Sequence, residues 1–241
     1  MPRSPLASDV AMVLAAGLGT RMRPLTLDRP KPLVEVAGRT MIDHCLDKLA
    51  EAGVARAVVN VHHFPQLVKD HLTARTNPAV AISDESGQLL ETGGGMIRAL
   101  PLLAADPFFC INSDNLWVDG PQDVFRQLSK AWKPDSMDAL LLVVPHARAA
   151  NHKGKGDFHM DANGRLTLRR SGRIAPFIYS GIQLVSQRLL RDAPRGPFGT
   201  MVLWKRAMAE ARLYGVSHLG LWYEVGSPDA IAPTEEALLH G

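Results

Sequence analysis

Short apolar runs alternate with amphipathic segments along the first half of the chain. The apolar runs, which have the pattern of buried strands, are residues 10–14, 54–61, 80–83 and 108–112. The segments with apolar residues at helical spacing are 41–52, 64–72 and 95–103. Strands that alternate with helices favour a parallel sheet, because parallel neighbours need crossover connections. We therefore predict an α/β fold with a Rossmann-like, mostly parallel sheet and helices on both faces.

The second half of the chain has a different pattern. Short strand-like runs at 139–145, 156–160 and 166–170 are separated by turn signals such as Asn163-Gly164, which predicts a small antiparallel insertion. A helix is expected over 200–213 and a last strand over 219–225. A length of 241 residues suits a single domain over 10–241, preceded by a flexible tail over 1–9.

Charge, hydropathy and cysteine content limit the expected partners. The 27 Lys and Arg residues barely exceed the 24 Asp and Glu residues, which does not favour a nucleic-acid partner. No apolar run approaches the roughly 20 residues that cross a bilayer, so no membrane partner is expected. The apolar stretch 10–16 resembles a short signal peptide, but Asp9 abuts it and a polar turn follows, which argues against export. Cys45 and Cys110 lack the spacing of a disulfide framework or a zinc site, so we expect a reducing cytoplasm.

A glycine-rich turn with nearby cations follows the first strand. It reads Leu14-Ala-Ala-Gly-Leu-Gly-Thr-Arg21, and Pro30-Lys31-Pro32 follows nine residues later. Glycines at such a turn let backbone N–H groups approach phosphate oxygens. Arg21 can bind phosphate through its planar fork and Lys31 as a point charge, held by the prolines that flank it. The segment therefore predicts a phosphate-binding site.

Glycines after a buried strand also occur in three kinds of turn that this segment matches less well. A dinucleotide-binding turn needs a third glycine and an acidic residue about 20 positions later, but Arg21 and Met22 occupy the glycine position and the second strand ends near Asn60. A Walker loop needs a closing Gly-Lys-Ser/Thr, which is absent. An ordinary β-to-α turn would account for Gly17 and Gly19 alone, but not for their combination with Arg21 and Lys31.

The run from Leu14 to Thr26, taken with Pro30-Lys31-Pro32, resembles the opening signature of the sugar-1-phosphate nucleotidyltransferases. Within that family the chain is most similar to the N-acetylmuramate-1-phosphate uridylyltransferases of cell-wall recycling. Residues 91–95, 156–158 and 180–182 carry that likeness, which spans residues 10–237. The resemblance implies a nucleotide-diphospho-sugar transferase fold. It also implies a reaction that joins a nucleoside triphosphate to a sugar-1-phosphate and releases pyrophosphate, with UTP and N-acetylmuramate-1-phosphate as the expected pair and GTP with mannose-1-phosphate as the alternative.

Two carboxylates are implied as ligands of Mg²⁺. Asp114 follows the fourth strand, at the edge where open α/β sheets bind ligands, and matches a magnesium-binding aspartate of the family. Glu224 stands where the family has a second aspartate, and Ser113 replaces the family's usual glycine. Judged from the residues alone, Asp114 could instead cap a helix and Glu224 could face solvent. The two departures keep open a catalytically silent relative that senses a sugar nucleotide.

The resemblance implies Arg21, Lys31 and Asp114 as catalytic residues. The implied nucleotide- and sugar-binding residues are Ala15, Ala16, Gly17, Gly19, Thr20, Arg21, Lys31, Glu85, Thr92, Gly93, Asn112, Gly156, Asp157 and Ser180. Ordinary structural roles compete for several of them, such as a turn for Asp157 and solvent exposure for Glu85. The Glu-Lys-Pro element that several family members use to hold the sugar phosphate is missing. Arg169 or Arg170 could replace its charge or could be solvated strand residues.

Overall fold

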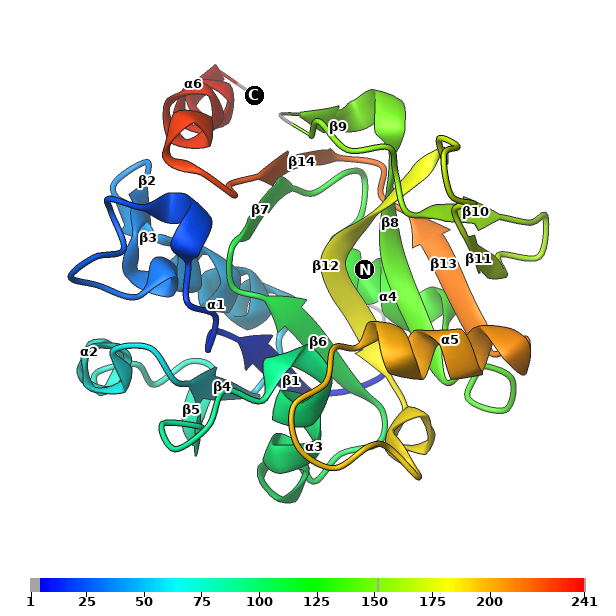
Figure 1. Cartoon of the computed structure of the whole chain (residues 1–241), viewed down its shortest axis with the longest axis horizontal. Coiled ribbons are helices and arrows are strands. Elements are labelled where there is room, and N and C mark those ends of the chain that lie inside the picture. The colour runs from blue at the N-terminus through cyan, green and yellow to red at the C-terminus, as the bar shows by residue number, and fades with distance from the viewer. Residues whose placement is uncertain (1–4, 151, 241) are drawn as a thin grey trace.

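Among the residues that the structure describes, nine strands form one mixed sheet (Figure 1). The computed structural model describes residues 5–150 and 152–240. The strand order is β11-β10-β12-β6-β1-β4-β5, with β8 paired to β12 and β13 paired to β8. These strands are β1 Val10–Leu14, β4 Arg56–Val61, β5 Ala79–Asp84, β6 Phe108–Asn112, β8 Ala139–Pro145, β10 Phe158–Met160, β11 Leu166–Leu168, β12 Phe177–Val185 and β13 Leu213–Ser217.

The sheet has a parallel half and a largely antiparallel half. Strands β6, β1, β4 and β5 are parallel to one another, whereas β12 is antiparallel to both β6 and β8. Strands β10 and β11 form an antiparallel hairpin beside β12. The predicted α/β class, with a mostly parallel sheet in the first half and an antiparallel insertion, is therefore confirmed.

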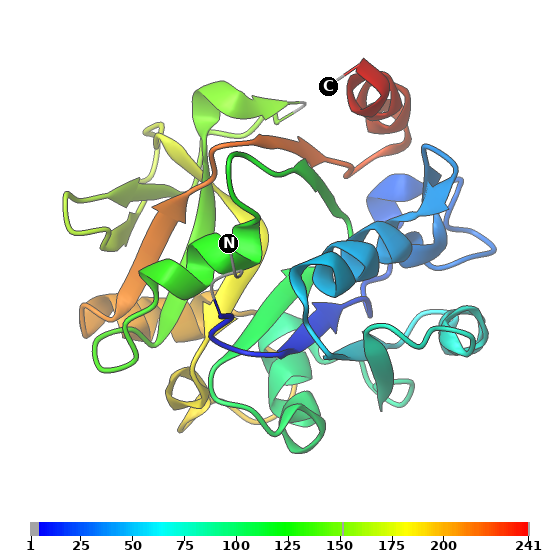
Figure 2. The same ribbon diagram turned by 180° about the vertical axis from the view of Figure 1, so that it is seen from behind.

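Helices cover both faces of the sheet. They are α1 Met41–Ala52, α2 Pro65–Leu72, α3 Glu91–Leu103, α4 Val124–Ala131, α5 Met201–Ala209 and α6 Ile231–His240. Side chains of α1, α2 and α4 pack with Ala11 and Val13 of β1, while those of α3 and α5 pack with Val10 and Met12. This division follows from the period of two along a strand. Helices α3 and α5 face the viewer in Figure 1, and α1 and α4 do so in Figure 2.

Two smaller sheets lie beside the main one. Strand β14, Leu221–Glu224, pairs with β7, Asn115–Val118, and with β9, Ala149–Ala150. Strands β2, Glu35–Val36, and β3, Arg39–Thr40, form a short hairpin before α1. Because β7 directly follows the loop after β6, the first of these sheets extends from the carboxyl edge of the parallel strands.

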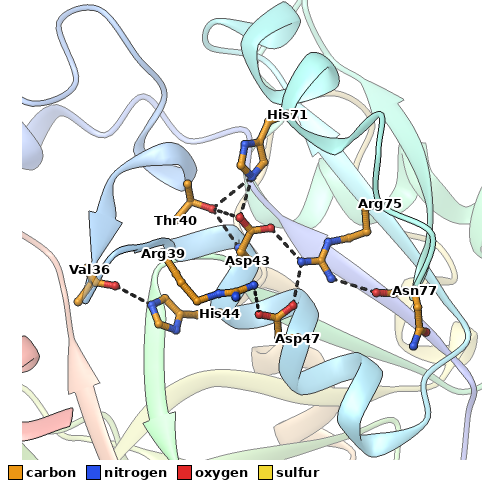
Figure 3. Close-up of polar contacts among 9 residues, drawn as sticks. All are labelled: Val36, Arg39, Thr40, Asp43, His44, Asp47, His71, Arg75 and Asn77. Carbon is orange, nitrogen blue, oxygen red and sulfur yellow. Dashed lines mark hydrogen bonds and ion pairs between the residues drawn. The ribbon is translucent and has the colours of Figure 1, made fainter. Parts of the chain in front are cut away.

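A polar network joins α1 to α2 and the segment after it (Figure 3). Asp43 accepts hydrogen bonds from Thr40 Oγ1 at 2.7 Å and from Arg75 at 2.9 Å, and its Oδ2 lies 2.8 Å from His71 Nε2. Arg75 also donates to Asp47, which pairs with Arg39 as well. Burial favours the neutral form of Asp43, but these hydrogen bonds outweigh it, so the pKa of Asp43 is lowered.

Several predicted boundaries differ from the structure. The helix expected over 200–213 ends at Ala209, because Ala211 has a φ of 54° and the next residues form β13 against β8. The helix expected over 95–103 begins at Glu91, so the glycine run lies inside α3. The strands and α-helices that the patterns did not predict are β2, β3, β7, β9, β12, β13, α4 and α6.

The predicted tail falls partly outside the described residues, which exclude 1–4. Its later part packs on the domain: Ala7 N donates to Ser129 Oγ at 2.9 Å, and Ser8 is buried. At Ala7 and Ser8 the predicted tail therefore lies against the rest of the chain. Within residues 5–150 and 152–240, no helix combines the length and apolar character needed to span a bilayer.

Candidate active site

The glycine-rich turn folds back against the segment that carries Lys31. Gly19 has a φ of 63°, and a Cβ atom there would lie 2.9 Å from the Cβ of Lys31. Thr26 Oγ1 donates to the Gly19 carbonyl at 2.8 Å, and Lys31 begins the 3-10 turn Lys31–Leu33. A side chain at position 19 would thus be strained and would displace the lysine. The sequence pattern indicates a glycine here for phosphate access, and the structure shows a packing requirement as well.

Lys31 and Asp114 form an ion pair at the carboxyl edge of the sheet. Lys31 Nζ lies 2.6 Å from Asp114 Oδ2. The lysine side chain is 11% exposed and that of the aspartate 31%, so the pair is partly shielded from water. The two residues follow β1 and β6, which are parallel neighbours that pair Leu14 with Asn112. The register of these strands therefore places the cation and the carboxylate in one cleft.

A cavity of about 410 Å³ lies over this edge, within the range of about 300–1,000 Å³ that small-molecule sites occupy. The predicted site residues that line it are Ala15, Ala16, Gly17, Lys31, Thr92, Asn112 and Asp114. The lining residues that were not predicted are Leu14, Pro32, Asn60, Leu89, Glu91 and Ser113. The structure thus brings much of the predicted nucleotide site together, while the roles of its residues stay predictions.

Asn60 lines this cavity, although the sequence pattern marks it only as the end of a strand. Its Oδ1 accepts a hydrogen bond from Ala15 N at 2.7 Å, and its Nδ2 donates to Glu85 Oε1 at 2.8 Å. Asn60 lies near the end of β4 beside β1, at the same sheet edge where Asn112 ends β6. A polar residue at the end of a predicted parallel strand is thus the sequence feature that could have identified Asn60 as a site candidate.

Glu85 lies behind the cavity rather than on its wall. It is 2% exposed, and its Oε2 accepts from Leu90 N at 3.4 Å. Burial raises the pKa of Glu85, partly offset by the hydrogen bond from Asn60. The Glu85 carboxylate is therefore linked to Ala15 of the glycine-rich turn through Asn60, and its direct contact with a nucleotide stays a prediction.

The start of α3 is held by the loop before α5. Gly93 N and Gly94 N donate to the Phe198 carbonyl at 2.8 and 3.1 Å. A Cβ on Gly93 would collide with the Phe198 ring, so this glycine is buried by packing and does not line the cavity. Thr92 does line it, and its Oγ1 accepts from Thr200 N at 2.9 Å. The backbone N–H groups of Gly93 and Gly94 are thus bonded within the protein.

Arg21 and Glu224 line a second cavity, of about 480 Å³. Arg21 NH1 lies 3.7 Å from Glu224 Oε1, and His152 Nδ1 lies 2.8 Å from Glu224 Oε2. Strand β14 pairs Glu224 with Asn115, the residue after Asp114. The predicted catalytic and metal-binding residues are therefore divided between two cavities that approach each other at this strand pair.

Several of the remaining predicted residues bond to backbone groups. Ser180 is fully buried and its Oγ accepts from Ile182 N at 3.2 Å. Asp157 Oδ2 accepts from Tyr179 N at 2.9 Å, and Arg169 Nε donates to the Gly156 carbonyl at 2.9 Å. The other three are exposed or half-buried and line neither cavity: Gly19, Thr20 and Arg170. Arg169 is thus engaged with backbone carbonyls, and a ligand would have to displace those contacts to use its charge.

Comparisons with known proteins show which proteins this chain is similar to. The model of the family described as nucleotidyl transferase matches residues 10–167. The N-acetylmuramate alpha-1-phosphate uridylyltransferase of Caulobacter vibrioides is 45% identical over 96% of this chain and 98% of its own length. The mannose-1-phosphate guanylyltransferase catalytic subunit beta of Dictyostelium discoideum is 28% identical over 90% of this chain and 61% of its own. The inositol-1-phosphate CTP transferase of T. maritima has a TM-score of 0.78 at 18% identity, covering 97% of this chain and 96% of its own, which supports the fold.

Proposed function

Because this chain belongs to the nucleotidyl transferase family, as a sugar-1-phosphate nucleotidyltransferase, we propose that it joins UTP to N-acetylmuramate-1-phosphate and releases pyrophosphate. The 45% identity to the Caulobacter uridylyltransferase across almost the whole of both chains supports this substrate pair over GTP and mannose-1-phosphate. The structural observation that carries the proposal is the Lys31–Asp114 pair on the wall of the 410 Å³ cavity.

The reaction is an in-line displacement at phosphorus. A phosphate oxygen of the sugar-1-phosphate forms a bond to the α-phosphorus of UTP, and the bond from that phosphorus to the bridging oxygen breaks. The bridging oxygen leaves with its electron pair on pyrophosphate. The nucleophile needs no general base, because a phosphate monoester has a second pKa of about 6 and is mostly dianionic at neutral pH.

The main barrier is electrostatic, since one anion must approach another. We assign Lys31 to the phosphates in the first cavity, where its ammonium is already held at the wall. The backbone of Ala15, Ala16 and Gly17 lines the same cavity and supplies the surface for the nucleotide. Arg21 adds a second cation from the adjoining cavity. Alignment and charge neutralisation are the principal contributions of proteins to such transfers.

The donor set fits Mg²⁺, which binds proteins through one or two carboxylates and completes its shell with phosphate oxygens and water. Asp114 offers a half-buried carboxylate at the cavity wall, with one oxygen paired to Lys31. Glu224, whose present partners are His152 and Arg21, would be the second carboxylate to hold the ion. Among the residues described, no three His, Cys, Asp or Glu side chains gather as a metal cage. When bound, the ion would neutralise phosphate charge.

We also propose a cytoplasmic location. Both cysteines, Cys45 and Cys110, are free and buried, and burial raises the pKa of the Cys110 thiol to about 12. Such thiols are typical of proteins in reducing compartments.

A panel of the four nucleoside triphosphates against several sugar-1-phosphates, read by pyrophosphate release in the presence of Mg²⁺, tests the proposal. We expect the largest kcat/KM with UTP and N-acetylmuramate-1-phosphate, and almost none in Asp114→Ala. A preference for GTP and mannose-1-phosphate would replace the substrate pair. Binding of a UDP-sugar without pyrophosphate release from any pair would instead indicate a silent sensor.

A further inference from the structure

Glu91 is an acidic residue on the wall of the first cavity. Neither the sequence motifs nor the comparisons give it a role in binding or catalysis. It is exposed at the first position of α3. Within residues 5–150 and 152–240, no hydrogen bond or ion pair engages its carboxylate, whereas Asp114 on the same wall is paired to Lys31. The described part of the cavity wall therefore contains one free carboxylate.

The backbone of Glu91 is strained. Its φ is 59°, in the left-handed region that costs an L-residue free energy and that glycine adopts without penalty. The hydrogen bonds from Gly93 and Gly94 to the Phe198 carbonyl fix the start of α3 and so fix this conformation. A glutamate kept at a position that suits glycine, with its side chain on a cavity wall, suggests a role for the carboxylate.

The strand order indicates how a nucleotide in this cavity would lie relative to Glu91. Lys31 and Asp114 lie on the β6 side of β1, where the phosphates are assigned. Asn60 lies on the β4 side, and its partner Glu85 also bonds Leu90 N, the residue before Glu91. A nucleotide with its phosphates near Lys31 would extend its nucleoside across β1 toward Glu91, because the negative charge there disfavours the triphosphate.

The chemistry of a nucleoside selects the group that a carboxylate would bind. A carboxylate only accepts hydrogen bonds. Uracil offers a single N–H between two carbonyl oxygens, and both carbonyls would repel the anion. Ribose offers two neighbouring hydroxyl donors, which match the two carboxylate oxygens, and acidic side chains bind ribose hydroxyls in this way in other nucleotide sites. We infer that Glu91 accepts hydrogen bonds from the ribose hydroxyls of the nucleotide and selects ribonucleotides; this rests on the proposed function.

The test compares UTP with 2′-deoxy-UTP and 3′-deoxy-UTP, with N-acetylmuramate-1-phosphate as acceptor. For wild-type protein we expect kcat/KM to fall roughly tenfold to a hundredfold when a hydroxyl is removed, as for a hydrogen bond to a charged group. In Glu91→Gly, the ratio of kcat/KM with UTP to kcat/KM with the deoxy analogue should approach one. The thermal midpoint of unfolding should be kept or raised, since glycine relieves the backbone strain. Glu91→Gln keeps one acceptor oxygen and should give an intermediate ratio.

Asp192→Gly is the matched control, because Asp192 is also an exposed carboxylate with a positive φ, 53°, but lines neither cavity. It should keep the wild-type ratio. Full discrimination in Glu91→Gly would overturn the inference, as would a change in base preference without a change in ribose preference. If wild-type protein releases no pyrophosphate from UTP, the proposed function fails separately. Calorimetric binding of UTP and 2′-deoxy-UTP to wild type and Glu91→Gly then decides the role of Glu91.

Discussion

Lys31 and Asp114 are 83 residues apart in sequence, yet Lys31 Nζ lies 2.6 Å from Asp114 Oδ2. The pairing of Leu14 with Asn112 brings the loops after β1 and β6 to one edge, and the close contact of Gly19 with Lys31 holds the lysine there. The carboxylate is thereby oriented by a cation that is itself assigned to the phosphates. Loss of the Lys31 charge should therefore also change the position of the Asp114 carboxylate.

Removing the charge of Lys31 tests this coupling. Lys31→Met keeps the apolar stem and should lower kcat/KM by roughly 10²- to 10³-fold, as for the loss of one fixed electrostatic group in a site. Lys69→Met is the control, because Lys69 Nζ lies 2.6 Å from Asp84 Oδ2 but lines neither cavity. It should keep near-normal activity. Steady-state pyrophosphate release measures both, and equal losses in the two variants would contradict the role of Lys31.

Gly19→Ala and Gly38→Ala separate backbone strain from displacement of the lysine. Both glycines have positive φ, 63° and 73°, so each variant should lose roughly 1 kcal/mol of unfolding free energy. Only at Gly19 would the new Cβ press on Lys31, since a Cβ at Gly38 meets nothing within 4 Å.

We therefore expect kcat/KM to fall at least tenfold in Gly19→Ala and to stay close to wild type in Gly38→Ala. Urea unfolding and pyrophosphate release measure the two effects on the same preparations. Wild-type activity in a folded Gly19→Ala would show that this contact does not position Lys31.

The elements that local pattern predicts well are those whose ends carry their own signals. Helix α1 begins and ends as predicted, because Thr40 Oγ1 accepts from Asp43 N at its start and Gly53 has a φ of 97° at its end. The apolar run 10–14 forms β1 with the predicted bounds, since it is buried between two parallel neighbours. The shared edge of β1 and β6 then follows from α/β topology, and with it the meeting of Lys31 and Asp114.

The elements that were missed depend on partners distant in sequence. The helix predicted over 200–213 includes Leu213, but the pairing of residues 213–217 with β8 makes Leu213 the first residue of a strand. Strand β12 contains Gly181 with a φ of 86° and a shift of register before Gln183, so its alternation is broken. The run from Gly93 to Gly95 suggests a turn by composition. It lies inside α3 instead, where Phe198 and Gly196 leave no room for side chains at Gly93 and Gly94.

The same limit applies to the site. Asn60 bonds Ala15 and Glu85, from two other segments, and neither contact has a local signature. Glu91 occupies a strained position that is set by the loop near Phe198. The cavity-lining residues of the glycine-rich turn were thus predictable by motif, whereas those held by contacts with distant segments were not.

Glu85 should make stability depend on pH in the direction that burial dictates. Burial raises its pKa, so the folded protein holds the proton more tightly than the unfolded chain. Its contribution to stability is therefore complete below the unfolded pKa of about 4.3 and is lost as pH rises through the folded pKa. Relative to Glu85→Gln, the unfolding free energy of wild type should fall as pH rises from about 4 to 7. Urea unfolding across this pH range measures the two free energies. A difference between wild type and Glu85→Gln that does not change with pH would contradict a raised pKa for Glu85.

Asp43 should show the opposite dependence. Its lowered pKa means that its contribution to stability is present above the unfolded pKa of about 3.9 and is lost as pH falls through the folded pKa. Asp43→Asn should cost roughly 1–3 kcal/mol of unfolding free energy at neutral pH, because Arg75 and His71 lose a charged partner. The cost should shrink below about pH 4. Catalytic activity should be unchanged, because this network lies on α1 and α2 and lines neither cavity.

A double-mutant cycle with Arg75→Gln isolates the pair itself. If Asp43 stabilises the fold through Arg75, the coupling energy should be at least about 0.5 kcal/mol at pH 7 and should diminish under acid conditions. Asp47 also accepts from Arg75, so the coupling should be smaller than the whole cost of Arg75→Gln. If the unfolding free energies lost in the two single variants add up at every pH, then Thr40 and His71 rather than Arg75 lower the pKa of Asp43.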